Sequence, residues 1–317
     1  MPKSPFYRHK PIGSISSLCR ALRIHGISPR HLTHLAETAD EYFRVAKEIP
    51  KPNGVRVVHD VREPLKTVQK AIHTQIFGSA IFPPYLSGGI KGRSTKWHAQ
   101  PHVGAEILIN EDISNFFPSI IQEQVQDLFI HGFGFAPEVG LLLAKLQTLR
   151  GTVPQGASTS GDIANLMMFR TEPKLAEELE SRGFAYSRFV DDVSISTQRQ
   201  NVDEKELAAV ISMVVSNARS HGLETNRKKH SIARKGTQMA TVGHLVNRKL
   251  SIPKSYESAA HIAVKKAEIL TKQAPGSADT QKSLKSAKGK VAYLAGLRPK
   301  RAALLHRRIE ALNDLLN

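Results

Sequence analysis

The most informative segment of the chain reads Tyr186-Ser-Arg-Phe-Val-Asp-Asp-Val-Ser-Ile-Ser196. Runs of aromatic and β-branched residues flank the adjacent carboxylates Asp191 and Asp192, a pattern that predicts strand, two-residue turn, strand. The simplest interpretation is a solvated acidic turn. The alternative is that the carboxylates hold a divalent metal ion, because Mg²⁺ takes oxygen ligands and usually binds one or two carboxylates together with substrate phosphates. That alternative requires a third carboxylate from elsewhere in the chain.

A candidate third carboxylate follows an apolar run earlier in the sequence. The run Ala105-Glu-Ile-Leu-Ile-Asn-Glu-Asp112 predicts a buried strand that delivers Asp112 at its carboxyl end, where open α/β sheets place their ligands. Capping of the next helix is the structural alternative for Asp112. The carboxylate of the strand and those of the hairpin are best explained together, as ligands of a shared metal site.

The chain is strongly basic, which points to a polyanionic partner. Its 317 residues allow more than one domain, and 40% hydrophobic with 6% aromatic residues argue against disorder. Lys and Arg number 45 against 28 Asp and Glu, a formal charge of +17. Nucleic acid is the leading candidate partner because clustered Lys and Arg replace phosphate counterions, and an anionic membrane surface is the rival.

The remaining composition predicts a cytoplasmic protein. Cys19 is the only cysteine, which excludes a disulfide framework and a cysteine-based zinc site. The sequence begins without an apolar signal core and has no apolar run near the ~18 residues of a membrane span. We therefore expect no membrane partner.

The first hundred residues contain two basic segments that could bind phosphate. Residues 1–48 are expected to be helical, with a helix start at Ser28-Pro29. A hairpin with an Asn53-Gly54 turn should follow and carry Lys51 and Arg56 near its tip, as a phosphate clamp or as a solvated turn. The next glycine-rich loop, 88–95, carries Lys91 and Arg93 and is either a phosphate cradle or a flexible surface loop.

The rest of the pattern favours an α+β domain followed by a basic helical tail. The loop 151–161 contains Gln155 among small residues, which would let a base or sugar lie against backbone; a simple loop is the alternative. From residue 248 onward, 15 Lys or Arg stand against 5 acids, which favours a nucleic-acid grip over a merely solubilising surface. Further elements are expected as helices at 64–77, 120–129, 137–149, from 162, 203–220, 255–272 and 283–316 with a break at Arg298-Pro299, and as a strand at 241–247.

Six motifs in this order resemble those of a bacterial reverse transcriptase, and most closely those of retron reverse transcriptases. The resemblance covers roughly residues 45–300. The motifs are Lys51 with Arg56, Asp112 with Phe117, Gln155-Gly156, Phe189-Val-Asp-Asp192, Asn226 with Lys229, and Gly289-Lys-Val-Ala-Tyr293. The resemblance implies a right-hand polymerase with an N-terminal helical segment (1–48), fingers (49–104, with part around 120–160), an antiparallel palm sheet with helices on one face (105–247) and a helical thumb (248–317).

The chain departs from the family pattern at several places. Phe189 replaces the Tyr of Tyr-x-Asp-Asp, and His98 replaces the Asn of Asn-Ala-x-x-His, which ends here at His102. Thr241-Val-Gly243 stands where Val-Thr-Gly is usual, and Ser158 and Gly161 replace prolines. The three aspartates are unaffected, so the departures bear on RNA recognition rather than on the chemistry.

The resemblance implies a role for each acidic residue. Asp112 and Asp191 would ligate two Mg²⁺ ions, with the Ile113 carbonyl as a further ligand and Asp192 as the supporting acid. Two such ions can lower the pKa of an attacking 3′-hydroxyl and stabilise the leaving pyrophosphate.

It also implies a deoxynucleotide site. Lys51 and Arg56 would hold the triphosphate of the dNTP, and Gln155 with Gly156 the sugar and the nascent pair. Lys229 would neutralise or protonate pyrophosphate. Phe117 falls where the family places an aromatic that clashes with a ribose 2′-hydroxyl; a core phenylalanine is the alternative.

Retron resemblance finally implies a cognate structured noncoding RNA. The RNA would be template and, through an internal 2′-hydroxyl, primer, so that the product is single-stranded DNA joined to RNA, in anti-phage defence with an effector protein. The candidate RNA contacts are Lys91, Arg93, His98, His102, Gly243, Lys288, Lys290 and Arg298, with a structural role as the alternative for the two histidines. The rival functions are another bacterial reverse transcriptase, of group II intron or abortive-infection type, and a non-catalytic RNA-binding protein on a polymerase fold.

Overall fold

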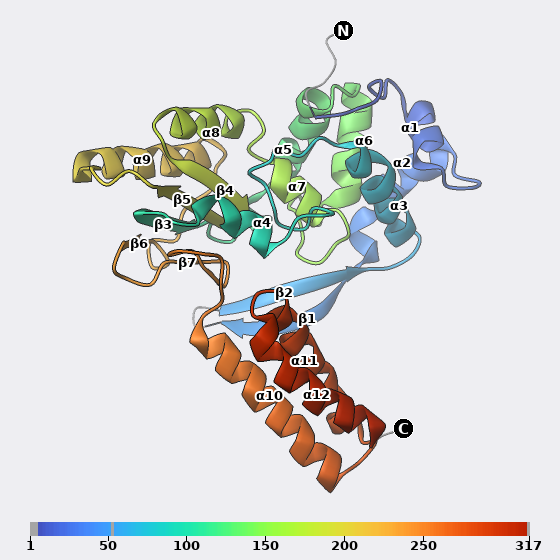
Figure 1. The fold of residues 1–317 in the computed structure, drawn as a ribbon. Coiled ribbons are helices and arrows are strands. Elements are labelled where there is room, and N and C mark those ends of the chain that lie inside the picture. Colours follow the sequence, from blue (N-terminus) through green and yellow to red (C-terminus); the bar gives the residue numbers. More distant parts are fainter. Residues whose placement is uncertain (1–5, 52–53, 316–317) are drawn as a thin grey trace.

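The centre of the molecule is a four-stranded antiparallel sheet with the strand order β4-β5-β3-β6. The computed structural model describes residues 6–51 and 54–315, and Figure 1 shows how helices surround this sheet. The strands are β3 (Ile107–Asp112), β4 (Ala185–Phe189), β5 (Asp192–Thr197) and β6 (Ser231–Arg234). The predicted α+β class is confirmed, and the predicted strand at 105–112 is the buried central strand β3.

Strands β4 and β5 form the predicted hairpin, but its turn lies one residue earlier than the acidic pair. Phe189 pairs with Asp192, which leaves Val190 and Asp191 as the two turn residues. Asp192 is therefore the first residue of β5, and on its other side it pairs with Asp112, the last residue of β3. This register brings the three predicted aspartates to one end of the sheet.

The two faces of the sheet have different coverings. Ile109 and Ile195 point to one face and join an apolar cluster with Leu179 and Val210 of the covering helices. Leu108 points to the opposite face and packs in a smaller cluster. The first face carries α8 (Glu172–Ser181) and α9 (Glu204–Ser220), and the second carries α4 (Thr95–Ala99) and the small hairpin of β7 (Ala240–Thr241) and β8 (His244–Leu245).

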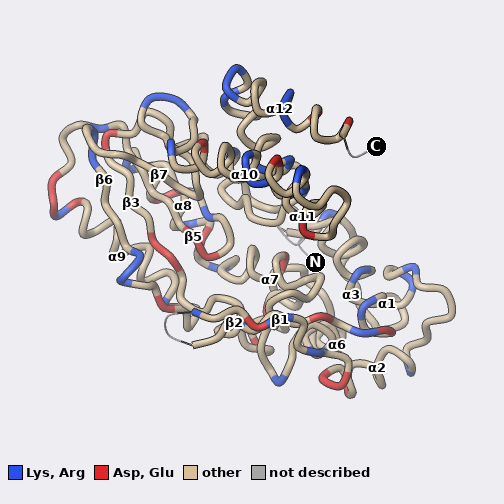
Figure 2. Tube along the Cα trace, turned by 90° about the horizontal axis from the view of Figure 1, so that it is seen from below, with Lys and Arg blue, Asp and Glu red and all other residues tan. Residues whose placement is uncertain are grey.

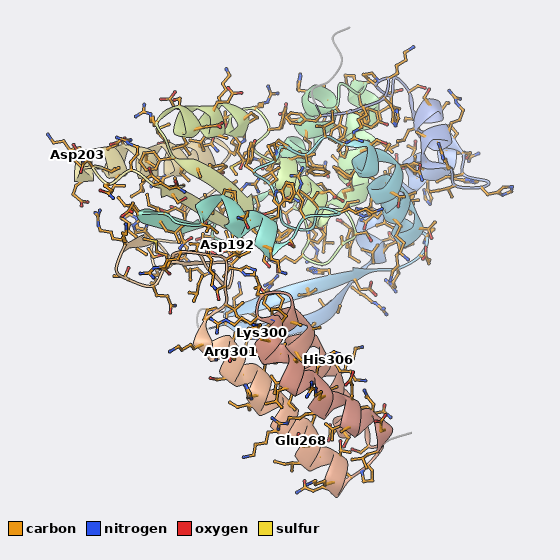
Figure 3. All side chains as sticks on the ribbon, in the orientation of Figure 1. Asp192, Asp203, Glu268, Lys300, Arg301 and His306 are labelled. Carbon is orange, nitrogen blue, oxygen red and sulfur yellow. The ribbon has the colours of Figure 1, made fainter. Side chains whose placement is uncertain are left out.

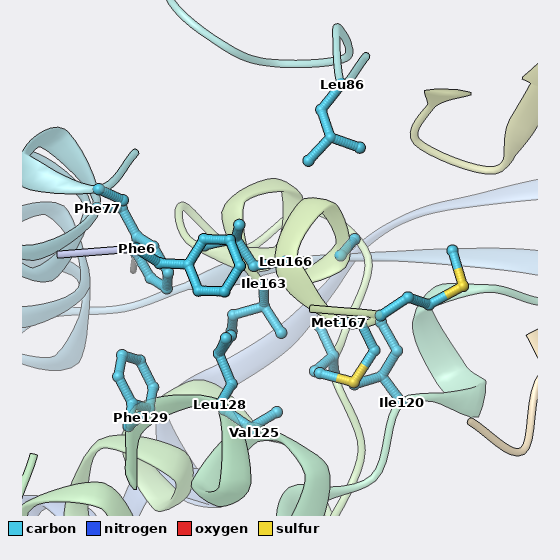
Figure 4. Close-up of a cluster of buried hydrophobic side chains, with 14 of the residues drawn as sticks. Phe6, Phe77, Leu86, Ile120, Val125, Leu128, Phe129, Ile163, Leu166 and Met167 are labelled. Carbon is cyan, nitrogen blue, oxygen red and sulfur yellow. The ribbon is translucent and has the colours of Figure 1, made fainter. Parts of the chain in front are cut away.

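Beside the sheet, six helices gather around an aromatic and aliphatic core. Phe77 and Phe129 lie with ring centroids 5.7 Å apart, and Figure 4 shows them with Ile163 and Leu166 of α7. The predicted helix start at Ser28 is confirmed, because its hydroxyl accepts a hydrogen bond from the amide of His31. The helices are α1 (Ile15–Leu22), α2 (Pro29–Glu37), α3 (Leu65–Ala71), α5 (Gln122–Asp127), α6 (Pro137–Gln147) and α7 (Ser160–Leu166).

A long two-stranded hairpin leaves this helical part. It consists of β1 (Phe43–Lys51) and β2 (Gly54–Val61). The sequence predicts helix as far as residue 48, but residues 43–48 are strand; pairing with β2 supplies backbone hydrogen bonds that a local helical pattern does not anticipate. The predicted Asn53-Gly54 turn includes Asn53, which lies outside the described residues.

The C-terminal part is a three-helix unit with a core of its own. Its helices α10 (Lys254–Gln273), α11 (Ala278–Ala295) and α12 (Pro299–Asp314) pack around residues such as Val264, Val291 and Leu305. The predicted break at Arg298-Pro299 is confirmed. No helix among the described residues is long and apolar enough to cross a membrane.

Candidate active site

The site is built at the end of β3 and β5, where two carboxylates face each other across the strands. Asp112 and Asp192 are directly paired, and the amide of Ile113 donates a 2.9 Å hydrogen bond to the carbonyl oxygen of Asp191. Desolvation by the surrounding protein, followed by the charges of Asp191 and Asp112, raises the pKa of Asp192 to about 6, although part of its side chain reaches the surface. Desolvation and the nearby Asp112 also raise the pKa of Asp191. Ionisation of Asp191 and of Asp192 is therefore costly in the folded protein.

Lys229 partly balances this negative charge. Its ammonium donates a 2.5 Å hydrogen bond to Oδ2 of Asp112, and this bond raises the pKa of Lys229. The side chain is 60% exposed, whereas Asp112 is buried. The amide of Asn226 donates to the carbonyl oxygen of Asp112 and fixes the loop that carries Lys229.

The acidic residues fit a divalent cation in their chemistry. In the ranges 6–51 and 54–315, no three carboxylate, imidazole or thiol groups converge closely enough to form a metal site by themselves. Yet the raised pKa of Asp192 means that an added positive charge would stabilise the ionised site, and carboxylate oxygens are the ligands that Mg²⁺ prefers. Lys229, which is bound to Asp112, already supplies one positive charge at this position.

Phe117 follows Asp112 by five residues and is only partly buried. It sits in a short 3₁₀ turn after β3, and its ring centroid is 6.2 Å from that of Phe116. Phe116 is the core member of the pair, with 2% of its surface exposed. Phe117 is packed against the same core but is less buried than Phe116.

The β1/β2 hairpin docks against the loop that carries Gln155. Arg56 Nε donates a 2.5 Å hydrogen bond to Oε1 of Gln155, and the amide of His59 donates to the Gln155 carbonyl oxygen at 2.7 Å. Gly156 allows this contact, since a Cβ there would lie 2.3 Å from the His59 carbonyl oxygen. A cavity of about 220 Å³ lined by Lys51, Arg56 and Gln155 lies at this junction.

Lys91 and Arg93 line a larger cavity of about 760 Å³, away from the acids. Arg8 and the ion pair of His73 with Asp162, 2.6 Å apart, line it as well. Arg93 is engaged inside the protein, because its guanidinium donates to the carbonyl oxygens of residues 82, 83 and 86. Lys91 is exposed.

His98 and His102 lie inside the protein rather than on its surface. Both are fully buried, and burial lowers the pKa of His98 to about 4 and that of His102 to about 3. In the His102 ring, Nδ1 lies 2.7 Å from the Ser196 hydroxyl, and Nε2 lies 2.6 Å from the Ser187 hydroxyl. These positions correspond to the structural alternative, two neutral imidazoles that bind hydroxyl groups.

Three of the positions at which the chain departs from the expected motifs, His98, Thr241 and Phe189, meet at this buried layer. His98 Nε2 lies 3.0 Å from the Thr241 hydroxyl and 3.1 Å from the Ser194 hydroxyl, and its ring is 6.2 Å from that of Phe189. Gly243 is exposed at the β7–β8 turn, with a left-handed φ of +80°.

The three predicted contacts on the C-terminal helices differ in their surroundings. Lys288 is exposed, and Lys290 places its ammonium 5.6 Å from the centre of the Tyr256 ring. Arg298 binds Glu257 at 2.6 Å and the hydroxyl of Ser251, so its guanidinium holds the helices together. Figure 2 marks Lys and Arg along α10, α11 and α12 and acidic residues along β3.

Sequence reasoning missed Glu172 and Arg188 behind the acidic turn, and it interpreted Gly88, on the other side of the turn, only as part of a phosphate cradle or surface loop. Arg188 belongs to the segment 186–196. It follows Tyr186 by two residues, so both side chains point to the same, core-facing side of β4. A charged residue at a core-facing position was the available signal, because such a residue is almost never fully buried without a partner.

Comparison with known proteins agrees with this geometry. The family model for reverse transcriptase (RNA-dependent DNA polymerase) matches residues 49–271. The Retron Se72 reverse transcriptase of Salmonella heidelberg is 33% identical over 229 residues, covering 72% of this chain and 59% of that protein. The Retron Ec48 reverse transcriptase of Escherichia coli is 30% identical over 234 residues, covering 70% of this chain and 56% of that protein.

The chain thus spans less than three fifths of the length of these two relatives. Apo telomerase from Candida tropicalis shares 12% identity, with a TM-score of 0.48 over 86% of this chain and 61% of that chain, a likeness too slight to argue from. The family match covers most of the chain and contains the three aspartates, Gln155 and Lys229. The chain therefore belongs to the reverse transcriptase family.

Proposed function

We propose that this chain is an RNA-directed DNA polymerase of retron type. It would copy part of a cognate structured noncoding RNA into single-stranded DNA that stays joined to the RNA. The observation that supports the proposal best is the pairing of Asp112 with Asp192 across β3 and β5, with Asp191 in the adjoining turn. A protein that only bound RNA would gain nothing from bringing three mutually repelling carboxylates together.

In this proposal Asp112 and Asp191 hold Mg²⁺, with the Ile113 carbonyl as a further ligand. Asp192 supports them from the first position of β5. Two bound Mg²⁺ ions would lower the pKa of the primer hydroxyl and stabilise the leaving pyrophosphate. The protein's own part would be to hold the ligands in one place through the β3–β5 register and the Ile113 amide.

Lys229 would act on the leaving group. Its raised pKa keeps Nζ protonated at neutral pH, and its 60% exposure leaves it able to turn from Asp112 toward pyrophosphate. The positive charge would stabilise the pyrophosphate, and Nζ is the atom from which a proton would be donated.

The dNTP would bind between the β1/β2 hairpin and the acids. Lys51 and Arg56 would hold the triphosphate, and Gln155 with Gly156 the sugar and the nascent pair, at the 220 Å³ cavity. Phe117 would exclude a ribose 2′-hydroxyl from the same site. The Arg56–Gln155 hydrogen bond supports this placement, because it joins the proposed phosphate-binding and sugar-binding elements before substrate arrives.

The RNA would lie along the basic surfaces. Lys91 at the 760 Å³ cavity and Lys288 and Lys290 on α11 would contact phosphate, with Gly243 near the primer strand. For Arg93, Arg298, His98 and His102 we propose positioning roles, since their polar atoms already bind the protein. The functional division would be fingers at 49–104, palm at 105–247 and thumb at 248–317, and the cellular setting cytoplasmic anti-phage defence with an effector protein.

Primer extension tests the polymerase proposal. Purified protein should add dNTPs to a primer annealed to RNA in Mg²⁺, and Asp191→Asn should abolish the addition. Asp203→Asn is the matched control: Asp203 caps α9 away from the site (Figure 3), and Asn caps equally well. Wild-type protein inactive on every RNA offered would refute the polymerase and leave an RNA-binding protein.

Sequencing of nucleic acid that copurifies with the protein tests the retron part. A small RNA covalently joined to DNA is the expected result. Active polymerase that copurifies with bare RNA only would favour another bacterial reverse transcriptase.

A further inference from the structure

The turn that carries Asp191 contains a strained residue. Val190 has a left-handed φ of +58°, which a β-branched side chain rarely adopts. Such a conformation persists only where the surrounding structure holds it in place. Two sets of contacts reach Val190, one from inside the sheet domain and one from the glycine-rich loop at 88–95.

Arg188 holds the turn from inside. Its guanidinium is fully buried, and Nη1 donates a 2.9 Å hydrogen bond to the Val190 carbonyl oxygen. The same guanidinium donates to the carbonyl oxygens of Ala164 and Asn165 at the end of α7, at 3.2 and 2.7 Å. Its other two N–H groups bind Glu172 at 2.6 and 2.8 Å. All five donors are used, so the guanidinium has one possible position.

Glu172 is bound by a second residue, Tyr186, in addition to Arg188. The hydroxyl of Tyr186 donates a 2.7 Å hydrogen bond to Oε1 of Glu172, which is 1% exposed. The carboxylate neutralises the arginine, and together they join β4, α7 and α8 behind the turn. A buried pair of this kind is costly to break on one side only.

Gly88 holds the turn from the opposite direction. A Cβ at Gly88 would lie 2.5 Å from Cγ2 and 2.9 Å from the amide nitrogen of Val190, so only glycine fits against the turn. The segment before it runs along β4, where the amide of Ser87 donates to the Arg188 carbonyl oxygen at 3.0 Å. Asn165 closes the ring, because its side chain donates a 2.6 Å hydrogen bond to the Gly88 carbonyl oxygen.

We propose that Gly88 and Arg188 are positioning residues that clamp the Val190 peptide and thereby place the Asp191 carboxylate for divalent metal. The clamp rests on the proposed polymerase function for its purpose. According to the proposal, the glycine-rich loop 88–95 and the buried Arg188–Glu172 pair set the affinity of the site for metal, although neither would touch metal or substrate. The residues behind a ligand commonly contribute about 10- to 100-fold to metal affinity or activity.

Two substitutions disturb the clamp from its two sides. Gly88→Ala pushes on Val190, and Arg188→Lys removes the bonds to the Val190, Ala164 and Asn165 carbonyl oxygens. Mn²⁺ binding to nucleic-acid-free protein, followed by the EPR signal of the free ion, should weaken about 10-fold or more in each. In primer extension, half-saturation should move to higher Mg²⁺ and kcat should fall, while the KM for dNTP stays at the wild-type value.

The controls make the same chemical changes elsewhere. Gly13→Ala meets no atom within 4 Å, and Arg308→Lys disturbs a pair with Glu268 on the C-terminal helices (Figure 3). Both should bind Mn²⁺ like wild type, and melting temperatures separate loss of folding from loss of metal. Gly88→Ala remains decisive where Arg188→Lys does not fold.

The outcomes separate the clamp from the function. Wild-type Mn²⁺ affinity in folded Gly88→Ala protein overturns the clamp, even if the wild type polymerises. A rise in the KM for dNTP in place of weakened metal binding overturns it as well. Weakened Mn²⁺ binding in both variants, with a wild type that adds no nucleotide, supports the clamp and refutes the polymerase.

Discussion

Asp192 is the residue in which the electrostatics of the site are most visible. Its pKa of about 6 lies well above the ordinary 3.8, because desolvation by the surrounding protein and two neighbouring carboxylates disfavour its charge. At neutral pH the folded protein must therefore carry this charge at a cost that the unfolded chain does not have. A bound cation would offset that cost.

The cost predicts a pH-dependent effect of Asp192→Asn. With the pKa raised on folding, the favourable contribution of Asp192 is present below about pH 3.8 and is lost as the pH rises through about 6. In EDTA, the melting temperature of the variant should exceed that of wild type above pH 6, and the difference should shrink toward pH 4. Thermal unfolding across this range measures it. A difference that does not vary with pH would mean that Asp192 is not the titrating group.

Phe117 carries the proposed discrimination against ribonucleotides. Phe117→Ala should reduce the preference for dNTP over rNTP about 10-fold or more, since removal of the ring admits the 2′-hydroxyl. The ratio of kcat/KM for the two substrates is the measurement. Phe116→Leu is the control, because buried Phe116 should affect the melting temperature and leave the ratio unchanged. Unchanged discrimination in Phe117→Ala would assign that ring to packing.

At the scale of elements, the docking of the β1/β2 hairpin on the Gln155 loop depends on one glycine. Gly156 has a φ of +105° and leaves no room for a Cβ beside the His59 carbonyl oxygen. Gly156→Ala should therefore displace the hairpin and raise the KM for dNTP about 10-fold or more, as a loss of about 1.4 kcal/mol in substrate binding would do. Steady-state kinetics measure this.

Gly161→Ala is the matched control for that experiment. Gly161 is the second residue of α7, directly after the Gln155 loop, and a Cβ there would meet no atom within 4 Å. The variant should keep the wild-type KM and gain slightly in stability from the better helix propensity of alanine. Equal KM values in the two variants would contradict the docking role of Gly156.

The sequence predicted those elements whose signals are local. The helix α9 has an acidic N-cap at Asp203 and a glycine two residues after its end, and β4 and β5 alternate about a short turn; both were recognisable. The β1 strand was not, because residues 43–48 acquire their conformation by pairing with β2 across the hairpin. Local propensity cannot report a partner that lies ten or more residues away.

The same limit applies to the site. Asp112, Asp191 and Lys229 are chemically conspicuous, and the structure brings them together. The alternation of β4 places Arg188 on the core face, but its partner Glu172 comes from the preceding helix. Pairing of these two buried charges is a property of the assembled core that sequence spacing does not show.

At the scale of the molecule, the basic charge is concentrated on α10, α11 and α12, the proposed thumb. These helices have their own core and reach the sheet domain through few contacts: Lys96 donates to the Gly296 carbonyl oxygen at 2.8 Å, and the Tyr293 hydroxyl lies 2.9 Å from His244 Nε2. In Figure 3, Lys300 and Arg301 mark the end of α12 nearest the sheet domain. The positive charge of this three-helix unit would favour contact with the phosphates of a nucleic-acid backbone.

Salt dependence tests that contact. Lys288→Ala should weaken RNA binding and reduce the slope of log K against log salt by about 1, as expected for the loss of one phosphate contact. Arg298→Ala should instead lower the melting temperature and leave the slope unchanged, since Arg298 binds Glu257. Filter binding over a salt series gives the slopes. A slope unchanged in Lys288→Ala would remove α11 from the RNA interface.

The buried layer of His98, Thr241 and Phe189 has a consequence for how such chains diverge and recombine. His98 Nε2 lies 3.0 Å from the Thr241 hydroxyl, and the His98 ring packs edge-on against Phe189, so a substitution at His98 changes the surroundings of both other residues. The effects of substitutions at these positions should therefore be non-additive. A chimera of this chain with a relative should take all three positions from the same parent.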